Sequence, residues 1–584
     1  MWIHQEESEP LVVRENKIMN TKQEIVEKIK KILLGLGVKK PQVQLDIPAH
    51  VKMGDYSSSV AMVCAKELNK KPIELAEEIK SKLVSNNTLG LLKIEVVNPG
   101  FINFFFDKNY FGDVVKEVIL EKEGYGKSDS LGAKKIMVEF TDPNPFKEFH
   151  IGHLMSNTIG ESISRIIIAR GAEVKRACYQ GDVGLHVAKA IWDLLKKEIY
   201  IVRDVRQSAS AYVAGSELYE SSSIIKGEVD EVNKKIYSRT DEIINKLYDQ
   251  GKKVSLDYFE TIYKKLGTKF DYYFFESEVG VFGQETVEKN LPNIFEGSEG
   301  AVVFKGEKYD PTLHTRVFIN KDGLPTYEAK ELGLAKIKYD RYPYDESVVI
   351  TGNEINEYFR VLLKAMSLIF PDLAKKTKHL SHGMLRLPTG KMSSRTGKVI
   401  TAESLILEVQ EKILEKMKDR EISDDKKKEI SEIIAIGALK YSILKQTTGK
   451  DIIFDFDKSL SFEGDSGPYL QYATVRANSI LKKVENIKLK VESEIPENWT
   501  TTNLERLLER FPSVVERAGT EYAPSHVATY LIELAGEFNS FYASHKIIDE
   551  TDPTSPYRLA LTQAFVHVMT SGLNLLGIKV PSQM

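Results

Sequence analysis

The sequence is poor in cysteine, in long apolar runs and in net charge, and each shortage excludes a class of protein. Only Cys64 and Cys178 occur among 584 residues, which excludes a disulfide framework and a cysteine-rich zinc site. No apolar stretch approaches the roughly 18 residues that span a bilayer, and the acidic start, MWIHQEESEP, does not resemble a signal peptide. Lysine plus arginine total 81 and aspartate plus glutamate 84, so a formal charge of −3 excludes a chain that is basic throughout. These shortages favour a cytoplasmic, multidomain protein with no membrane segment.

The first part of the chain predicts a small mixed domain. From Thr21 the apolar residues repeat at helical spacing as far as the glycines at 35 and 37, and a second helix is expected at about residues 72–83. The segment LLKIEVVNPGFINFFFD predicts two strands joined at Asn98-Pro99-Gly100. We therefore expect an N-terminal extension over residues 1–19 and an α+β domain over residues 20–127.

The next part predicts an α/β domain with a doubly wound parallel sheet. KIMVEF, from Lys135, reads as a buried strand, TDPNPFKEF as a loop, and EVKRACY as the following strand. Between them, residues 150–170 have helical periodicity, and the inward positions are Leu154, Ile159, Ile163, Ile166 and Ile167. A strand, loop, helix and strand in this order begin a Rossmann-type catalytic domain, which we place at residues 128–402. Charged helical sequence at about 195–300 is expected to be an insertion, and residues 403–584 are expected to form an all-α bundle.

The first motif that could carry chemistry is HIGH, at the predicted start of the helix. His150 and His153 are three residues apart and share one helical face, so both can reach one ligand. The free N–H groups and the positive dipole of a helix N-terminus suit a phosphate. Gly152 allows a ligand to approach the backbone. The alternative interpretation is a pair of surface histidines, which the strand–loop–helix context disfavours.

The second motif is the glycine-flanked segment LPTGKMSSRTGKV. Its hydroxyls and cations could fold over a polyphosphate through charge and backbone N–H groups. A solvated surface loop is the alternative. The candidate residues are Lys391, Ser393, Ser394 and Arg395.

Together the two motifs resemble the HIGH and KMSKS signatures of class I aminoacyl-tRNA synthetases. Further segments resemble the arginyl-tRNA synthetases of that class: VEFTDPNPFKEFHIGHLMS, YQGDVGLHVAK, GLPTYEAKELGLA, SFEGDSGPYLQYATVRANSIL and GLNLLGIKVP. The resemblance runs from about residue 20 to the C-terminus. It implies a ligase that uses ATP to convert L-arginine to arginyl-adenylate and transfers arginine to the 2′-hydroxyl of the terminal adenosine of tRNA(Arg). It also implies that residues 20–127 bind the tRNA elbow and residues 403–584 the anticodon.

The resemblance also implies roles for residues around ATP, with Mg²⁺ assisting. The implied catalytic residues are Lys147, His150, His153 and Lys391. Here Ser394 stands where the KMSKS signature has its second lysine, and Lys147, three residues before His150, could supply a cation from the other side of the phosphates. The implied ATP-binding residues are His150, Gly152, His153, Gly181, Asp182, Met384, Lys391, Ser393, Ser394 and Arg395; no protein residues are expected to ligate a metal.

Arginine recognition is implied at four further positions. Glu139 and Asn144 would hold the ammonium and carboxylate end, and Tyr327 and Glu331 would face the guanidinium group. The family usually has aspartate where this chain has Glu331, so the charge is kept on a longer side chain. The family has a further glutamine after the strand SVVIT. In this chain Asn353 and Glu354 are the candidates to replace it.

Other functions remain open from the sequence. A related class I synthetase for glutamate or cysteine is one, although two cysteines are too few for a cysteinyl enzyme's zinc site. A synthetase paralogue that binds RNA without catalysis and a small nucleotidyltransferase are the others. For the arginyl enzyme we expect a monomer whose partners are L-arginine, ATP and tRNA(Arg).

Overall fold

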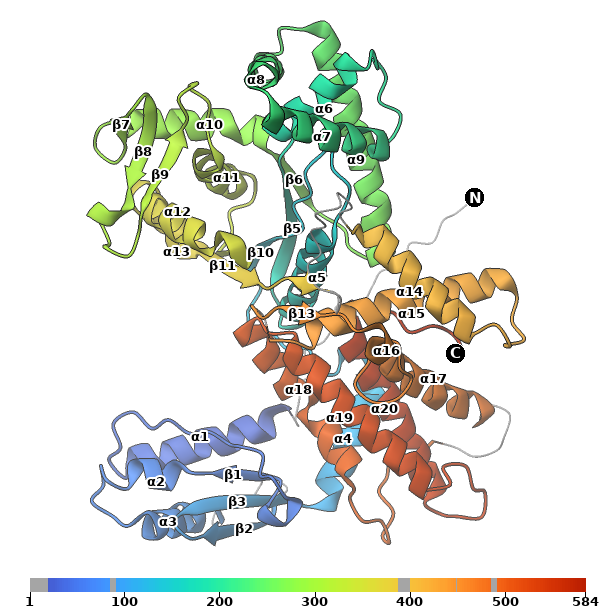
Figure 1. Cartoon of the computed structure of the whole chain (residues 1–584). Coiled ribbons are helices and arrows are strands. Elements are labelled where there is room, and N and C mark those ends of the chain that lie inside the picture. Colours follow the sequence, from blue (N-terminus) through green and yellow to red (C-terminus); the bar gives the residue numbers. More distant parts are fainter. Residues whose placement is uncertain (1–18, 85–90, 387–399, 448, 485–490) are drawn as a thin grey trace, which may run out of the picture. The chain divides into compact units, whose positions relative to one another are not determined.

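The computed structural model describes residues 19–84, 91–386, 400–447, 449–484 and 491–584 (Figure 1). The chain forms two compact units. The first contains the residues up to Tyr125 together with 477–512 and 536–568, and the second contains 126–476, 513–535 and 569–584. Both units therefore draw on the helical C-terminal part of the chain. The second sequence motif, with Lys391, lies outside the described residues.

The N-terminal part of the first unit is an α+β module, as its sequence predicts. Strands β2 and β3 pair antiparallel on either side of Asn98-Pro99-Gly100, and β1 pairs with the other edge of β3. Asp107 caps α4 by accepting a hydrogen bond from the N–H of Asn109. The elements are α1 (Met19–Gly35), β1 (Tyr56–Ser58), α2 (Val60–Cys64), α3 (Pro72–Val84), β2 (Leu91–Val97), β3 (Phe101–Phe106) and α4 (Lys108–Glu121), with short 3₁₀ turns η1 (Val51–Met53) and η2 (Lys122–Gly124).

The second unit is built on a five-stranded parallel sheet, which confirms the α/β prediction. The strand order is β11-β10-β4-β5-β6, and every neighbouring pair is parallel. The strands are β4 (Lys135–Glu139), β5 (Glu173–Gln180), β6 (Tyr272–Phe275), β10 (Glu346–Gly352) and β11 (Thr377–His382). Helix α5 (Ile151–Ala169) connects β4 to β5, and all five of its predicted inward residues are buried.

The charged region at residues 195–300 is mainly helical, but it is not one continuous insertion. Helices α6 to α9 form a bundle, and the chain then returns to the sheet as β6 because the Tyr272–Phe275 backbone pairs with the end of β5. The four aromatic residues YYFF suit a strand more than a helix. The helices of the bundle are α6 (Leu185–Lys196), α7 (Val205–Ser221), α8 (Ser223–Ser238) and α9 (Glu242–Leu266).

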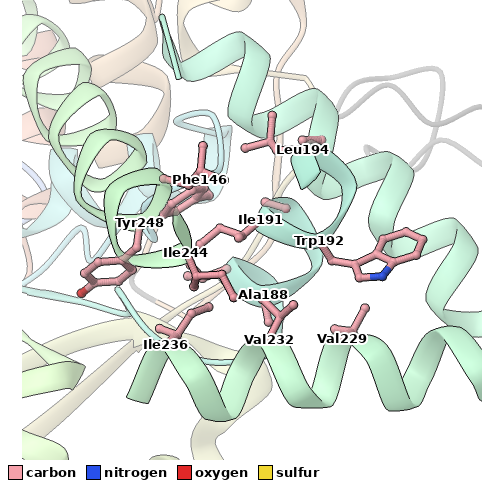
Figure 2. Packing of buried hydrophobic residues seen from close by; sticks show 14 of the residues in the cluster. Phe146, Ala188, Ile191, Trp192, Leu194, Val229, Val232, Ile236, Ile244 and Tyr248 are labelled. Atoms are coloured by element: carbon pink, nitrogen blue, oxygen red, sulfur yellow. The ribbon is translucent and has the colours of Figure 1, made fainter. Parts of the chain in front are cut away.

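A hydrophobic cluster holds this bundle to the loop that precedes α5. Figure 2 shows Phe146, from that loop, packed among side chains of α6, α8 and α9 such as Ile191 and Ile244. Phe146 is fully buried, and removing such a side chain typically costs about 3–5 kcal/mol. The bundle therefore fixes the backbone at Phe146, the residue immediately before Lys147.

A second, smaller sheet lies within the same unit. The segments AVVFKG and TRVFIN contain β8 and β9, which pair antiparallel with each other and not with the parallel sheet. The elements of this region are α10 (Glu276–Lys289), β7 (Glu296–Ser298), β8 (Ala301–Lys305), η3 (Gly306–Lys308), β9 (Thr315–Ile319), α11 (Tyr327–Arg341), η4 (Asn353–Ile355), α12 (Asn356–Ile369) and α13 (Pro371–Lys376).

The remainder of the chain is helical, as its periodicity predicts. Within the described residues of this part, two short strands, β12 and β13, are the exceptions and pair in parallel. No helix of the described chain combines the length and the apolar character that a membrane crossing requires. The elements are β12 (Leu385–Arg386), α14 (Ala402–Lys416), α15 (Asp424–Leu444), β13 (Ile452–Ile453), α16 (Phe456–Ser459), α17 (Gly467–Val484), α18 (Asn503–Glu521), α19 (Ser525–Ser544) and α20 (Ser555–Leu575).

Candidate active site

A cavity of about 710 Å³ opens at the carboxyl ends of the parallel strands. Glu139 ends β4, Tyr179 lies at the end of β5, and Ile350 lies near the end of β10, and all three line it. Open α/β sheets bind ligands at this edge because the loops that follow the strands meet there. The cavity walls include these sequence-predicted residues: Glu139, Asn144, His150, Gly152, Gly181, Tyr327, Glu331 and Met384.

The two histidines of the first motif cap α5 and stack on each other. His150 is the N-cap, and its Nδ1 accepts hydrogen bonds from the N–H groups of Gly152 and His153 at 3.1 and 3.4 Å. In return His153 Nδ1 accepts from the His150 N–H at 3.2 Å, and the ring centroids are 3.5 Å apart. Because each Nδ1 accepts, the proton of each neutral ring is on Nε2.

Only one of these histidines reaches the cavity. His150 lines it, whereas His153 is buried behind it against Phe149. Burial, reinforced by the nearby Lys147 cation, lowers the pKa of His150 to about 4, and burial also lowers the pKa of His153. At neutral pH both rings are uncharged, so His150 offers a neutral N–H donor. Gly152 is needed here because a Cβ atom would lie 2.9 Å from the His150 ring.

Lys147 is held beside this helix start by the helical bundle. The preceding residue, Phe146, has a φ of 66°, which is rare for a residue with a side chain. Its N–H donates to Ser255 Oγ at 2.9 Å, and its ring is buried, so the surroundings maintain this conformation. Lys147 itself does not line the cavity, and its Nζ lies 4.6 Å from the ring centroid of Tyr212 on α7.

Asn144 and Gly181 join two strand ends at the cavity wall. The Gly181 N–H donates to Asn144 Oδ1 at 3.1 Å. A Cβ atom at Gly181 would lie 2.6 Å from this oxygen and 3.0 Å from Glu276 Oε1, so only glycine allows both side chains their positions. The Gly181 backbone therefore packs closely against the Asn144 and Glu276 side chains in the cavity wall.

Buried lysines neutralise two of the cavity's carboxylates. Lys338 Nζ donates to Glu139 Oε2 at 2.7 Å, and Lys330 Nζ donates to Glu276 Oε2 at 2.5 Å. Arg316 lies 3.7 Å from Glu328. Because each of these carboxylates has a cationic partner in or behind the cavity wall, the three pairs present little net charge to a ligand.

Two other carboxylates lack such a partner. Among the described residues no lysine or arginine forms an ion pair with Glu331 or Asp142; one Asp142 oxygen accepts from the Tyr179 N–H at 2.8 Å. Burial, and then repulsion by Glu139, raise the pKa of both carboxyls well above their ordinary values. The cavity therefore has a region that favours a cation. Tyr327, one turn before Glu331 on α11, also lines it.

Asp182 is placed differently from the expectation for an ATP-binding residue. It is fully buried and does not line the cavity. Its carboxylate accepts hydrogen bonds from Tyr248 at 2.7 Å, Lys252 at 2.8 Å, and the N–H and hydroxyl of Ser277 at 2.9 and 2.6 Å. The side chain therefore joins α9 and the start of α10 to the end of β5.

Several lining residues were not predicted from the sequence. They include Asp142, Tyr179, Glu276 and Tyr358; of the two candidates for the missing glutamine, Glu354 lines the cavity and Asn353 does not. Asp142 follows the predicted strand KIMVEF by two residues, which is a usable signal. Tyr179, Glu276 and Tyr358 carry no local signal, because the sheet topology brings them together. Within the described chain, no group of histidine, cysteine and acidic residues is arranged to hold a metal ion.

Three family models match consecutive parts of the chain. The catalytic domain of class I tRNA synthetases for arginine matches residues 114–456. The arginyl-tRNA synthetase N-terminal domain matches residues 19–106, and the DALR anticodon-binding domain matches residues 470–584.

Individual relatives match over nearly the whole chain. The arginine–tRNA ligases of Clostridium acetobutylicum and Treponema denticola are each 31% identical to it, covering 97% and 92% of this chain and 100% and 94% of their own. The solved arginyl-tRNA synthetase of Thermus thermophilus is 25% identical with a TM-score of 0.79, covering 96% of this chain and all of that one. The Plasmodium falciparum arginyl-tRNA synthetase, at 20% identity and a TM-score of 0.78, has the same fold.

Proposed function

The chain belongs to the arginyl-tRNA synthetase family of class I tRNA synthetases, and we propose that it uses ATP to join L-arginine to tRNA(Arg). The observation that carries the proposal is the cation-favouring region of the cavity, where Glu331 and Asp142 have no ion-pair partner among the described residues. A guanidinium group is a permanent planar cation that pairs well with carboxylates. An amino acid with an uncharged side chain would leave the negative charge of these carboxylates without a compensating cation.

In the first step, an oxygen of the arginine carboxylate attacks the α-phosphorus of ATP in line. The bond between the α-phosphorus and its bridging oxygen to the β-phosphate breaks, so arginyl-adenylate and pyrophosphate form. No general base is needed because the carboxylate is already ionised at neutral pH. The protein's part is to position the reactants and to stabilise the charge that develops on the phosphates.

The start of α5 supplies donors for these phosphates. The neutral His150 can donate its Nε2–H while its Nδ1 remains occupied as the helix cap. Lys147 adds a cation next to this donor, and the proposal retains Lys391, Ser393, Ser394 and Arg395 on the grounds of the resemblance. His153 acts by holding the His150 backbone, and Asp182 by holding the end of β5, and neither needs to touch ATP.

Mg²⁺ enters the proposal as part of the ATP substrate. ATP carries the oxygen ligands that Mg²⁺ prefers, and the metal usually keeps several waters when bound with a nucleotide. The ion would neutralise phosphate charge alongside Lys147. The described protein residues are not assigned as its ligands.

The arginine side chain would lie between α11 and the strand ends. Glu331 and Tyr327, one helical turn apart, face its guanidinium group, and Asn144 and Glu139 lie towards its α-carbon substituents. The terminal adenosine of tRNA(Arg) then attacks the adenylate carbonyl carbon through its 2′-hydroxyl, and AMP leaves. Residues 20–127 would contact the tRNA elbow and residues 403–584 its anticodon, and the protein would act as a cytoplasmic monomer.

Pyrophosphate exchange into ATP, measured with each amino acid in turn with and without tRNA(Arg), tests the proposal. We expect exchange with arginine and with no other amino acid. As a family trait, this exchange should occur only when tRNA is present. Exchange with glutamate or another amino acid in place of arginine would refute it. The monomer is tested separately by light scattering of the purified chain.

A further inference from the structure

Lys147 is a cation that contacts an aromatic ring and not a carboxylate. Its Nζ lies 4.6 Å from the ring centroid of Tyr212, and no carboxylate among the described residues forms an ion pair with it. Glu276 is close enough for the Lys147 charge to lower the pKa of its carboxyl, but this carboxylate already accepts a hydrogen bond from Lys330 at 2.5 Å. The charge of Lys147 is therefore not compensated within the described protein.

The Lys147 ammonium lies close to the start of α5 and to the end of β5. After burial, its charge is the next cause that lowers the pKa of both His150 and His186. His150 caps α5 and lines the cavity. His186 Nε2 lies 2.8 Å from the carbonyl oxygen of Gly181, another residue that lines the cavity. The cation is therefore near two backbone segments of the cavity wall.

Helix α7 fixes the position of the Tyr212 ring. Asp204 caps this helix by accepting a hydrogen bond from the Gln207 N–H at 2.9 Å. Gly215, one turn after Tyr212, packs directly on α6, because a Cβ atom there would lie 2.2 Å from the Lys189 carbonyl oxygen. The partly buried Tyr212 ring packs against the hydrophobic cluster of the bundle. These contacts hold the ring independently of the cation beside it.

An aromatic partner leaves the charge of a lysine available, whereas a carboxylate does not. The face of a ring attracts an ammonium through its quadrupole, but the ring has no net charge. A carboxylate compensates the cation, as Glu139 does for Lys338 at 2.7 Å. Holding a long side chain in place before the substrate binds also reduces the entropy lost on binding. Such support suits a cation that acts on the phosphates of a substrate.

We propose that Tyr212 is a positioning residue that holds the Lys147 ammonium for the phosphates of ATP during adenylate formation. The inference rests on the proposed function and extends it to a residue of the helical bundle, outside the sequence motifs. Tyr212 is not one of the described residues that line the cavity, so it acts through Lys147 and touches no substrate. The bundle thus supports both the backbone before Lys147, through Phe146, and the charged end of its side chain.

Single-turnover formation of arginyl-adenylate, measured by rapid quench with tRNA(Arg) present, tests the inference. Tyr212→Leu removes the ring face but keeps an apolar side chain on the bundle, and it should slow the step about 2- to 30-fold, the range of a cation–π contact. Tyr212→Phe keeps the ring and should restore the wild-type rate. Tyr219→Leu is the matched control, because the Tyr219 ring on the same helix contacts Lys189 at 4.2 Å. A wild-type rate in Tyr212→Leu would overturn the inference.

A double-mutant cycle separates positioning of the lysine from a structural effect. If Tyr212 acts through Lys147, Tyr212→Leu should slow the wild type and have no further effect in the Lys147→Ala background. An equal slowing in both backgrounds would mark the ring as structural and overturn the inference. Fluorinated phenylalanines at position 212 keep the ring shape while each fluorine withdraws electron density from the ring face, so the rate should fall stepwise with fluorination. A rate that is independent of fluorination would contradict the cation–π contact.

The wild-type protein separates this inference from the proposed function. If wild type forms no arginyl-adenylate, the proposed function fails. If wild type forms it and Lys147→Ala slows it, but Tyr212→Leu is as fast as wild type, only the role of Tyr212 fails.

Discussion

The ring of Phe146 packs directly on Gly251 of α9, at a distance that excludes any side chain. A Cβ atom at position 251 would lie 2.2 Å from the Phe146 ring. The contact joins the helical bundle to the loop that leads to His150, and Lys147 is the next residue along. The bundle is therefore part of what positions the proposed catalytic lysine, although none of its helices ends at the cavity.

Gly251→Ala should disturb this contact and slow the reaction. The added methyl group must displace either the Phe146 ring or α9, and overpacking of this kind typically costs about 1–3 kcal/mol of stability. Because Lys147 follows Phe146, single-turnover formation of arginyl-adenylate should slow as well. Urea unfolding and rapid-quench measurements provide the two readouts.

Gly227→Ala is the matched control for this change. Gly227 lies in α8 of the same bundle, and apart from its chain neighbours and the adjacent backbone of α8 no described atom lies within 4 Å of the Cβ position. Alanine in a helix interior should there stabilise the protein by roughly 0.5–1 kcal/mol and leave the adenylation rate unchanged. Equal behaviour of the two alanine variants would contradict the role assigned to the Phe146 contact.

Lys147→Ala should slow adenylate formation by about 10²-fold, as the loss of one donor to a transition state can do. The expected loss is in the single-turnover rate at saturating ATP and arginine. Lys189→Ala is a suitable control, because Lys189 belongs to α6 and its Nζ lies 4.2 Å from the ring centroid of Tyr219, in a contact of the same kind. An unchanged rate in the Lys147 variant would remove this residue from the mechanism.

Glu331→Gln should raise the concentration of arginine that the enzyme needs. The amide keeps the shape but loses the charge, and hydrogen bonds to charged groups contribute about 1.5–3 kcal/mol, so the KM should rise roughly 10- to 100-fold. Glu331→Asp keeps the charge on a shorter side chain and should give an intermediate value. A steady-state titration of arginine checks this, and an unaltered KM in Glu331→Gln would discredit the guanidinium role.

The stabilisation that arginine gives should increase with pH. In the arginine-free protein the pKa values of Glu331 and Asp142 are raised above their ordinary values of 4.5 and 3.8. The folded state therefore binds more protons than the unfolded state from these values upward, so this contribution to stability declines as pH rises towards the raised pKa values. A bound guanidinium favours the ionised form of both carboxyls. It therefore offsets the decline in folded-state stability at higher pH.

Thermal unfolding with and without arginine across this pH range measures the effect. The Tm shift caused by arginine should be small in acid and grow as the pH rises. Glu331→Gln should reduce the growth, because one of the two titrating carboxyls is gone. A Tm shift that is independent of pH would contradict the assignment of the cation to these carboxylates.

The pH profile of kcat/KM for ATP should lack a histidine inflection near pH 6.5. The pKa of His150 is lowered to about 4 by burial and by Lys147, so the ring stays neutral in the free enzyme. Because the terminal phosphate of ATP also ionises in this range, wild type is compared with His150→Asn, and at saturating arginine the two profiles should have the same shape from about pH 8 to about pH 6. An inflection near pH 6.5 that is present in wild type and absent from His150→Asn would show that His150 titrates as an exposed histidine does.

Local pattern was enough to predict the elements that carry the first motif. The strand from Lys135, the loop and the helix after His150 follow from apolar runs, prolines and helical spacing, which act over a few residues. The strand at Tyr272–Phe275 was not anticipated, because four aromatic residues within a charged helical stretch reveal their role only when paired with β5. The sequence also did not predict that β8 and β9 belong to a separate sheet, since strand pairing joins residues that are distant in sequence.

Sequence by itself therefore determined the α/β class, the histidines at the start of α5 and the family to which the chain belongs. It also indicated Tyr327 and Glu331, which the resemblance to the family implies. Only the tertiary structure decided which carboxylates carry charge for a ligand. Lys338 and Lys330 pair with Glu139 and Glu276 across sequence separations of 199 and 54 residues, while Glu331 has no such ion pair among the residues that the structure describes.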